Sequence, residues 1–346
     1  MVSRKRSGAA SARLVVIMAA AVVGLACVAV ASATTAGAKG GAIPIAVLLN
    51  SSTNTYYQAN LRGAQAAAKK FGGKVVKVFD ANFDANTQAT QVQDAVTANQ
   101  YKVFLIAPTA SNVIVPEVKQ AIKSGIKVAC MLSPCGPNPN GLGRQIPGLV
   151  TFVGYSFTEN ANDIAKAVVM ACGKLNPCNV VYEPGNNTLP AEVIRTNAFN
   201  AYLKKYPHIK VLAEQQGGYL AAPGRTAMQN MLQAHPDINV AASSGDQMTL
   251  GMAQAVAAAG KAGKIKLIGN GASVPGVAAV RAGKWFATVA NVPYTEGYLA
   301  AEWALKAAKG TPLSKIPGYI DDLKYAPANA IITRAVAKTF KAQWAG

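Results

Sequence analysis

The stretch from Asn50 to Tyr57, which reads Asn-Ser-Ser-Thr-Asn-Thr-Tyr-Tyr, holds the densest group of potential ligand-binding side chains in the sequence. Its carboxamides and hydroxyls can both donate and accept hydrogen bonds, which suits a neutral polar guest. The aromatic faces of Tyr56 and Tyr57 could pack on the C–H face of a sugar or on a planar ring. The alternative is structural, with Ser52 or Asn54 capping a helix and the tyrosines in the core. Two consecutive tyrosines cannot both point into one core, so we expect at least one to face a cleft or solvent.

Catalytic and metal-binding patterns are missing from the sequence. It has no Gly-x-Ser-x-Gly or Walker motif, and its glycine-rich spots lack the Gly-x-Gly-x-x-Gly spacing of a dinucleotide site. The two histidines, His208 and His235, stand beside prolines and lack the spacing of zinc ligands. Asp246 opens a predicted helix, where it either caps the helix or contacts a ligand. We therefore expect no enzyme activity, cofactor or metal site, and an exported enzyme is a disfavoured alternative.

The elements that would position these residues alternate along the chain. Short apolar, β-branched runs predict buried parallel strands, and amphipathic stretches between them predict helices. This alternation makes two passes, over about 43–150 and 155–290, so we expect an α/β fold with two doubly wound parallel-sheet lobes. Such sheets bind ligands at the carboxyl ends of their strands. The predicted strands are 45–49, 75–79, 103–106, 126–131, 150–153, 179–182, 211–214, 238–242, 265–268 and 287–290, and the predicted helices are 57–71, 87–98, 112–123, 159–172, 191–204, 225–234, 247–259 and 295–308.

The first 38 residues have the pattern of an export signal. A basic start is followed by an apolar stretch at 14–31 and by small residues at 31–33 and 36–38. We therefore predict a signal peptide over 1–38 and an extracytoplasmic protein. Two alternatives remain open. The apolar stretch is near the length of a membrane anchor, and residues 24–27 resemble a lipoprotein cleavage box that would put a lipid anchor on Cys27, although Gly24 departs from that pattern.

Four cysteines lie beyond the export segment, at Cys130, Cys135, Cys172 and Cys178. They allow three pairings, and export favours their oxidation. The close spacings favour Cys130–Cys135 and Cys172–Cys178. The first bond would pin the loop after a strand, and the second would join the end of a helix to the next strand.

The chain is strongly basic, with a formal net charge of +19. Such a balance can indicate nucleic acid, an acidic surface or an anionic ligand. The lysines are spread along predicted helix faces, however, with no arginine-rich block and no basic strip interleaved with aromatics. We expect solvated faces that suit an anionic cell envelope, and no nucleic-acid partner.

Several segments together resemble the ribose-binding-protein family, also called type I periplasmic binding proteins. Residues 45–50, 54–57 and 63–65 resemble its opening strand, its Asn-Pro-aromatic-aromatic turn and its Gly-Ala helix, with Thr55 in place of the proline. The similarity continues through 107–109, 153–166, 228–237, 245–251 and 287–291, and so covers roughly 43–310. The resemblance implies a two-lobed extracytoplasmic receptor that closes on a small solute and delivers it to an ABC importer.

The resemblance also implies ligand-binding positions. Asn54, Tyr56 and Tyr57 match the family's polar and stacking residues, Asn50 stands where a serine is common, Tyr219 matches an aromatic of the second lobe, and Asn291 lies at an interlobe crossover. Other positions depart from the pattern. In the first lobe, Leu132 and Ser133 replace an Asp-Arg pair. In the second, Gly245 replaces an asparagine beside Asp246, and Asn270 and Gly271 replace an aspartate. The family's ligand-binding arginine of the second lobe aligns near Val193, and Arg195 matches a neighbouring structural arginine.

These departures remove charged partners that bind vicinal hydroxyls strongly. Amides, hydroxyls, tyrosines, Leu132 or Met131, and Phe157 remain. The ligand expected from them is a small neutral solute, which could be a sugar, a modified sugar, a polyol or a small ring compound. The residues favour a ligand with fewer hydroxyls, and a common pentose or hexose is possible but not favoured.

The predicted first lobe comprises 43–153 plus 292–320, and the second comprises 154–291 plus 321–346. The hinge would consist of three crossovers, near 153–155, 291–293 and 319–322. The expected partner is a membrane ABC permease, and we expect a monomer. The alternative is an envelope sensor that presents its closed form to a membrane signalling receptor. The lactose-repressor family shares the fold, but the export segment and the lack of a helix-turn-helix head argue against a regulator.

Overall fold

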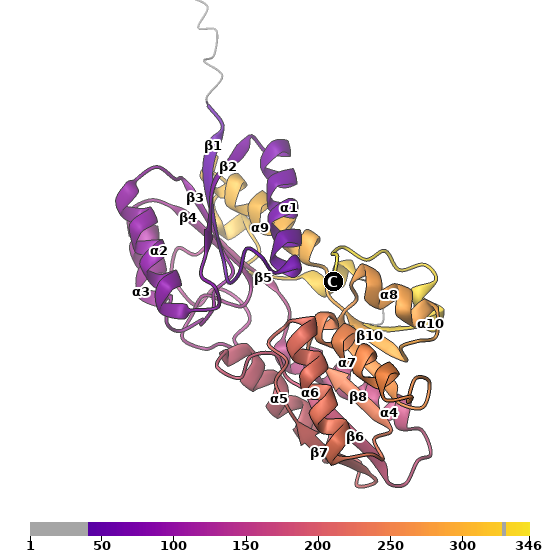
Figure 1. Cartoon of the computed structure of the whole chain (residues 1–346). Helices are drawn as coiled ribbons and strands as arrows, with labels where there is room; N and C mark the ends of the chain where they lie inside the picture. The colour runs from indigo at the N-terminus through magenta and orange to yellow at the C-terminus, as the bar shows by residue number, and fades with distance from the viewer. Residues whose placement is uncertain (1–40, 327–329) are drawn as a thin grey trace, which may run out of the picture. The chain divides into compact units, whose positions relative to one another are not determined.

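A computed structural model describes residues 41–326 and 330–346 (Figure 1). The predicted signal peptide and the lipid-anchor alternative at Cys27 lie outside the described residues. Residues 42–346 form one compact unit. Within the described part of the chain, no helix is both long and apolar enough to cross a membrane.

The first lobe is built on a six-stranded parallel sheet with the order β11-β5-β4-β3-β1-β2 (Figure 1). Helices α1 and α9 cover one face and α2 and α3 the other, each against its own apolar cluster. Coverage on both faces explains why β3 and β5 are buried along their whole length. The elements are β1 (Ile43–Leu49), α1 (Thr55–Lys70), β2 (Gly73–Asp80), α2 (Ala85–Ala98), β3 (Val103–Ile106), α3 (Val115–Lys123), β4 (Lys127–Leu132), β5 (Thr151–Gly154), α9 (Pro293–Ala308), a 3-10 turn η1 (Leu313–Lys315) and β11 (Tyr319–Asp321).

The second lobe repeats this plan with the order β12-β10-β9-β8-β6-β7. Its strands are parallel except for β12, which pairs antiparallel with β10. Helices α4 and α5 pack on one face, and α6, α7 and α8 on the other. The elements are α4 (Phe157–Cys172), β6 (Cys178–Glu183), α5 (Pro190–Leu203), β7 (Ile209–Glu214), α6 (Ala221–Ala234), β8 (Val240–Ser243), α7 (Asp246–Ala258), β9 (Lys266–Gly271), α8 (Val274–Arg281), β10 (Ala287–Ala290), a 3-10 turn η2 (Asp322–Tyr325), β12 (Ile331–Thr333) and α10 (Arg334–Ala337).

The chain passes between the two sheets three times: from β5 to α4, from β10 to α9, and from β11 to β12. Both sheets share the same local order, because β1 lies between β2 and β3 just as β6 lies between β7 and β8. In each sheet the strand order therefore reverses at one place, which is the topological switch point. It lies beside β1 in the first sheet and beside β6 in the second. The predicted two-lobed α/β fold is confirmed.

Helices α1 and α9 pack backbone against backbone in the first lobe. A Cβ atom on Gly63 would lie 1.9 Å from the carbonyl oxygen of Tyr294, and one on Gly297 would lie 2.0 Å from that of Asn60. Glycine is therefore required on both helices. This contact joins the helix that starts at the Asn54 turn to the helix that follows the second crossover.

Both favoured disulfides are present. Cys130 on β4 bonds to Cys135 in the following loop, with their Cα atoms 6.0 Å apart. Cys172 at the end of α4 bonds to Cys178 at the start of β6, with their Cα atoms 5.7 Å apart. The second bond therefore joins a helix end to the next strand, as the spacing predicted.

The sequence missed helix α8, which the structure places at Val274–Arg281. It has only eight residues and includes Pro275 and Gly276, so it offered no long apolar period. Ser273 caps it by accepting a hydrogen bond from the Gly276 N–H.

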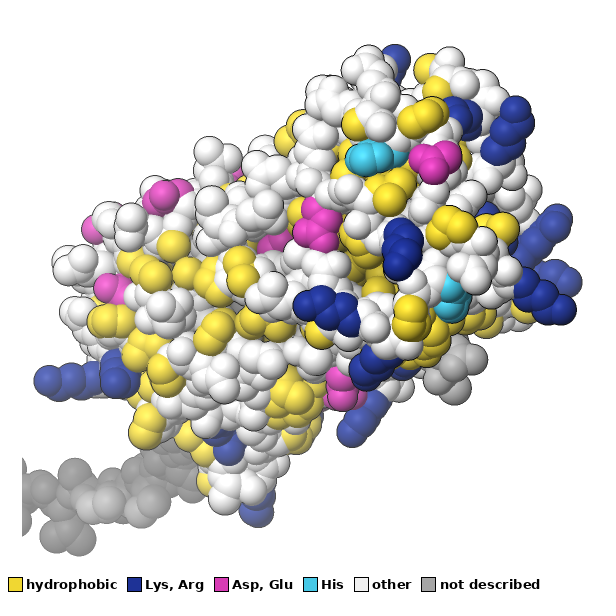
Figure 2. Space-filling model, turned by 90° about the horizontal axis from the view of Figure 1, so that it is seen from below, with side chains coloured by type: hydrophobic (Ala, Val, Ile, Leu, Met, Phe, Trp, Pro, Cys, Tyr) yellow, Lys and Arg dark blue, Asp and Glu magenta, His cyan; other side chains and the backbone are white. Residues whose placement is uncertain are grey.

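The lysines and arginines do not form one continuous patch on the face of the molecule that is seen from below (Figure 2). Hydrophobic and uncharged surface lies between them.

Candidate functional site

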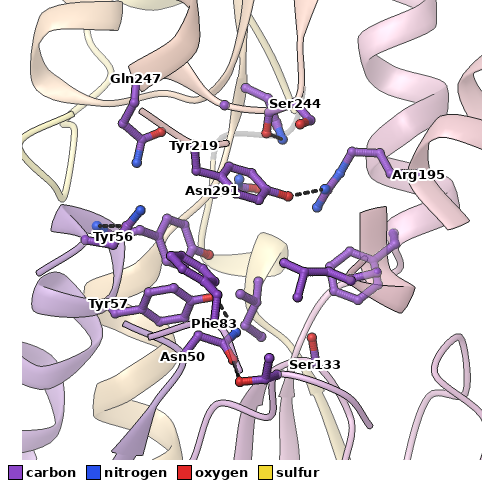
Figure 3. Close-up of a pocket in the computed structure, with 18 of the residues that line it drawn as sticks. Asn50, Tyr56, Tyr57, Phe83, Ser133, Arg195, Tyr219, Ser244, Gln247 and Asn291 are labelled. Carbon is purple, nitrogen blue, oxygen red and sulfur yellow. Dashed lines mark hydrogen bonds between the residues drawn. The ribbon is translucent and has the colours of Figure 1, made fainter. Parts of the chain in front are cut away.

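A pocket lies where the carboxyl ends of the two sheets meet (Figure 3). Its volume is about 70 Å³ when measured as the space open to the centre of a water molecule. About 10–15 Å³ on that measure holds one water, so the pocket suits a small guest. On the first lobe its lining includes residues that end or follow each of the strands β1 to β5, and on the second it includes residues that end or follow each of β6 to β10.

The first-lobe wall begins at the turn between β1 and α1. The Asn54 side chain caps α1 by accepting a hydrogen bond from the Tyr56 N–H at 3.0 Å. Asn50 Nδ2 donates to the Tyr57 hydroxyl at 2.6 Å, and the Thr109 hydroxyl donates to Asn50 Oδ1. The turn is thus both a helix cap and a pocket wall, and the Asn50 carboxamide is held in one orientation with one N–H left for a guest.

Both tyrosines of this turn line the pocket, although Tyr56 and Tyr57 are only 9% and 7% exposed. The Tyr56 hydroxyl donates to Glu296 Oε2 at 3.0 Å, so a pocket side chain is tied to α9 just after the second crossover. Burial, followed by repulsion from Asp322, raises the pKa of Glu296 well above its usual value. Burial also raises the pKa of Asp322, at the third crossover, to about 8.

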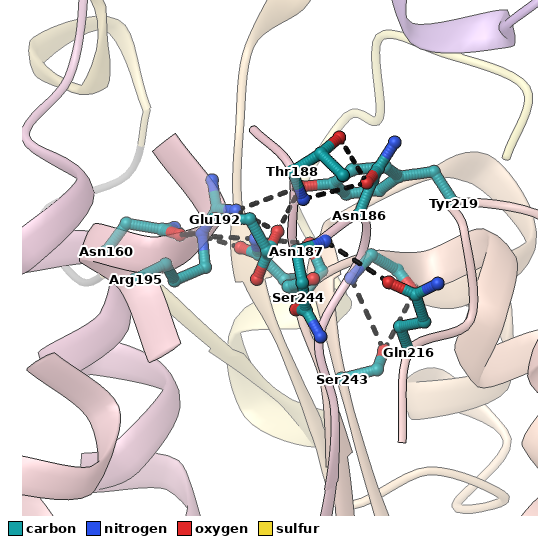
Figure 4. A network of polar contacts seen from close by, with 12 residues as sticks. Asn160, Asn186, Asn187, Thr188, Glu192, Arg195, Gln216, Tyr219, Ser243 and Ser244 are labelled. Atoms are coloured by element: carbon teal, nitrogen blue, oxygen red, sulfur yellow. Dashed lines mark hydrogen bonds and ion pairs between the residues drawn. The ribbon is translucent and has the colours of Figure 1, made fainter. Parts of the chain in front are cut away.

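The second-lobe wall carries a connected polar network (Figure 4). Arg195 Nη1 lies 2.7 Å from Glu192 Oε2 and donates to the Tyr219 hydroxyl at 3.1 Å, and that hydroxyl in turn donates to Glu192. Arg195 Nε donates to Asn160 Oδ1 at 3.0 Å, and Asn160 Nδ2 donates to Asn270 Oδ1 at 2.9 Å. The network therefore fixes one arginine, one tyrosine and one carboxamide of the pocket lining relative to each other.

Arg195 is the one charged side chain among the described residues that line the pocket. It is 4% exposed, and its partner Glu192 is fully buried. Burial alone would lower the pKa of Arg195, but Glu192 and nearby tyrosines raise it, so the guanidinium stays charged. No hydrogen bond joins its Nη2 to the described part of the chain, so this donor can serve a guest. Because the pair is neutral overall, the wall favours an uncharged guest with a hydrogen-bond acceptor.

Two aromatic residues meet across the pocket. Phe83, in the loop after β2, stacks on Tyr219 of the second lobe with ring centroids 6.4 Å apart and an interplanar angle of 17°. Phe83, Tyr219 and the pocket residue Leu132 all have left-handed backbones, with φ of 59°, 57° and 62°. Such conformations cost on the order of 1–3 kcal/mol each for residues other than glycine, and they concentrate at functional sites.

The structure brings most of the predicted ligand residues into one pocket lining: Asn50, Asn54, Tyr56, Tyr57, Leu132, Ser133, Phe157, Tyr219, Asn270 and Asn291. Asp246 is the exception. Its Oδ2 accepts from the Ser273 N–H and hydroxyl, both at 2.7 Å, and its Oδ1 accepts from the Thr288 hydroxyl at 2.7 Å. It is fully buried and joins α7, α8 and β10, so the expected ligand contact at Asp246 is corrected to a structural role.

Sequence reasoning missed Phe83 and Trp344, and it gave Arg195 a structural role only. Phe83 lies four residues after the end of the predicted strand at 75–79, so an aromatic in a loop at the carboxyl end of a strand was a usable signal. Trp344 lies beyond the last crossover, where the two-pass pattern gives no expectation. Arg195 therefore adds one charged side chain to the pocket lining. The described residues contain no group of three or more His, Cys, Asp or Glu placed to hold a metal ion.

Known proteins with similar sequences are named as sugar-binding proteins. The chain is 29% identical over 274 residues to the ribose import binding protein of Salmonella typhimurium, covering 77% of this chain and 85% of that protein. It is 28% identical over 282 residues to the D-allose-binding periplasmic protein of Escherichia coli, covering 79% and 88%.

Solved structures show the same fold. An ABC transporter solute-binding protein of Mycobacterium smegmatis with bound glycerol matches with a TM-score of 0.74 and 26% identity, over 88% of this chain and 100% of that one. A periplasmic solute-binding protein of Actinobacillus succinogenes with bound D-allose matches with a TM-score of 0.73 and 22% identity, over 86% and 100%. The periplasmic binding protein domain model matches residues 45–312. The resemblance inferred from the sequence is thus confirmed, and the protein belongs to the periplasmic binding protein domain family.

Proposed function

We propose that this protein is the extracytoplasmic substrate-binding component of an ABC importer and that it binds a small neutral solute between its two lobes. The observation that carries the proposal is the pocket itself, because residues of both lobes line it at the carboxyl ends of the two sheets. A guest that touches both walls stabilises the closed arrangement over an open one. The relatives with named functions are import binding proteins, which favours transport over sensing.

The lining supports a sugar, a modified sugar or a polyol as the guest. Seven aromatic side chains surround the pocket, and its polar groups are carboxamides, hydroxyls and one arginine that is neutralised by Glu192. Arg195, Asn50 and Asn291 would bind the oxygen atoms of the guest, and Tyr56, Tyr57, Phe83 and Tyr219 would enclose its C–H surface. The relatives named for ribose and D-allose, and the structure with bound glycerol, define the chemical range to test.

The proposal extends to the lobes and the partner. The first lobe would comprise 43–153 plus 292–320 and the second 154–291 plus 321–346, with the three crossovers as the hinge. The closed protein would dock as a monomer on a membrane permease. A signal peptide over 1–38 would deliver it outside the cytoplasm.

Isothermal titration calorimetry tests the binding function. Purified protein is titrated with D-ribose, D-allose, D-fucose, myo-inositol and glycerol, and with glucose 6-phosphate as a charged comparison. We expect at least one neutral compound to bind with a micromolar or lower Kd and the phosphate to bind more weakly, because no free cation in the pocket would compensate its desolvation. If none of the neutral compounds binds at millimolar concentration, the proposal is overturned.

A further inference from the structure

The segment from Gln343 to Gly346 is bonded to both lobes. On the second lobe, the Trp344 carbonyl oxygen accepts from the Val274 N–H at 2.9 Å, and the Trp344 Nε1 donates to the Gly271 carbonyl oxygen at 2.6 Å. On the first lobe, the Gln343 carboxamide accepts from the Thr295 N–H at 3.0 Å and donates to the Thr295 hydroxyl at 2.8 Å. The chain thus makes a fourth link between the lobes, in addition to the three crossovers.

A further bond extends this link to the turn that carries the pocket tyrosines. The Thr55 hydroxyl at the start of α1 donates to the Gly346 carbonyl oxygen at 2.9 Å. Figure 1 shows this end of the chain lying between the first lobe and α8. We call residues 343–346 the strap.

The Trp344 indole lies at the centre of the strap and lines the pocket. It is 2% exposed, packs with the apolar core of the first lobe, and meets the Tyr56 ring edge-on with centroids 5.6 Å apart. Its N–H is bonded to the second lobe, however, so a single side chain belongs to both. The second lobe leaves room for the ring: a Cβ atom on Gly271 would lie 2.3 Å from the indole, and Gly271 has a φ of +127°.

We propose that the strap is part of the ligand site: Trp344 forms a wall that contacts the guest and limits its size, and the strap holds the two lobes close together. The inference rests on the proposed binding function. It means that the strap, which lies beyond the last crossover, takes part in binding the guest. The indole fills space next to a pocket of only about 70 Å³, so its loss enlarges the site more than any polar change would. It also removes the ring against which Tyr56 packs.

Three variants separate these roles. Trp344→Ala removes the wall and the indole bond to the Gly271 carbonyl oxygen, while the backbone bond from the Val274 N–H remains. Trp344→Phe keeps an aromatic ring but removes the N–H donor. Trp303→Ala is the matched control, because Trp303 packs against the small cluster around Ile316 and does not line the pocket. Thermal melting of each variant shows whether it is folded, and Trp344→Phe keeps the test valid if Trp344→Ala does not fold.

Isothermal titration calorimetry with guests of increasing size measures how Trp344 affects the affinity and the size preference of the pocket. For the best small guest we expect Trp344→Ala to weaken binding more than tenfold and Trp344→Phe less, with the preference shifted toward larger guests such as a disaccharide. Trp303→Ala should bind as the unaltered protein does. Small-angle X-ray scattering of the ligand-free proteins reads out the link between the lobes, and we expect a larger radius of gyration for Trp344→Ala but not for Trp303→Ala.

The inference is overturned if the Trp344 variants keep the affinity, the size preference and the radius of gyration of the unaltered protein. If the unaltered protein binds none of the guests, the proposed function fails instead. Scattering alone then decides whether the strap links the lobes.

Discussion

At the scale of single residues, the site depends on residues whose conformations are set by contacts with their neighbours rather than by intrinsic backbone preference. Tyr219 illustrates this, because its left-handed backbone is kept in place while its hydroxyl contacts Arg195 and Glu192 and its ring stacks on Phe83. The residue therefore has two separable parts, a polar tip within the network and an aromatic face across the pocket.

Tyr219→Ala should weaken guest binding more than tenfold, which is about 1.4 kcal/mol. Tyr219→Phe keeps the ring and removes the hydroxyl, so we expect a smaller loss. Titration calorimetry compares the two with Tyr202→Ala on α5, which does not line the pocket. Equal affinity in Tyr219→Ala and the unaltered protein would exclude Tyr219 from the site.

Glu183 is a buried carboxyl group at the end of β6. It is fully buried, and neither of its oxygen atoms has a hydrogen-bond partner among the described residues. Burial raises its pKa to about 9. A raised pKa means that the folded state binds the proton more tightly than the unfolded state. The contribution of this group is then fully present below its unfolded pKa of about 4.3 and is lost as pH rises toward 9.

Glu183→Gln removes that titration at nearly constant volume. We expect its free energy of unfolding, relative to the unaltered protein, to increase by at least 1–2 kcal/mol, as an approximate magnitude, between pH 5 and pH 8. Urea unfolding at the two pH values measures this difference. Parallel pH profiles for the two proteins would mean that Glu183 does not titrate in this range.

At the scale of elements, the sequence predicted strands well because both faces of each sheet are covered, so β3, β5, β8 and β10 are uninterrupted buried runs. It predicted the Asn54 turn because the cap and the two tyrosines are adjacent in sequence. It gave no signal for Trp344 as a pocket residue, and for Phe83 it gave only the position in a loop after a predicted strand. Their placement depends on a left-handed loop and on contacts with residues far away in sequence, and a local period reports neither.

The contact between α1 and α9 gives a prediction at this scale. Gly297→Ala would place a Cβ atom 2.0 Å from the Asn60 carbonyl oxygen, and backbone cannot move aside without separating the helices. We expect a loss of roughly 1–3 kcal/mol or more in the free energy of unfolding. Urea unfolding measures it, with Ala308→Gly at the end of α9 as a mild comparison. A stability equal to that of the unaltered protein would show that the helices can part at no cost.

At the scale of the whole molecule, the two lobes are joined by three crossovers and by the strap, and we expect the lobes to move as bodies about these connections. The Tyr56–Glu296 bond connects the pocket to the second crossover, and Asp322 lies at the third. One pocket side chain is therefore in direct contact with the helix that follows the second crossover.

A guest that bridges both walls should make the protein more compact. We expect the radius of gyration from small-angle scattering to fall on addition of a bound neutral solute, and the melting temperature to rise with its concentration. A compound that raises the melting temperature without compaction would show binding without closure.

The order of the strands has a consequence for how the protein is made. The edge strand β11 and the covering helix α9 complete the first sheet, yet both follow the whole second sheet up to β10 in the chain. A ribosome must therefore synthesise the chain as far as Asp321, past five strands of the second sheet, before the first lobe has all its strands. No contiguous fragment contains the complete first lobe without most of the second, so the first lobe of a nascent chain stays incomplete until β11 has been synthesised.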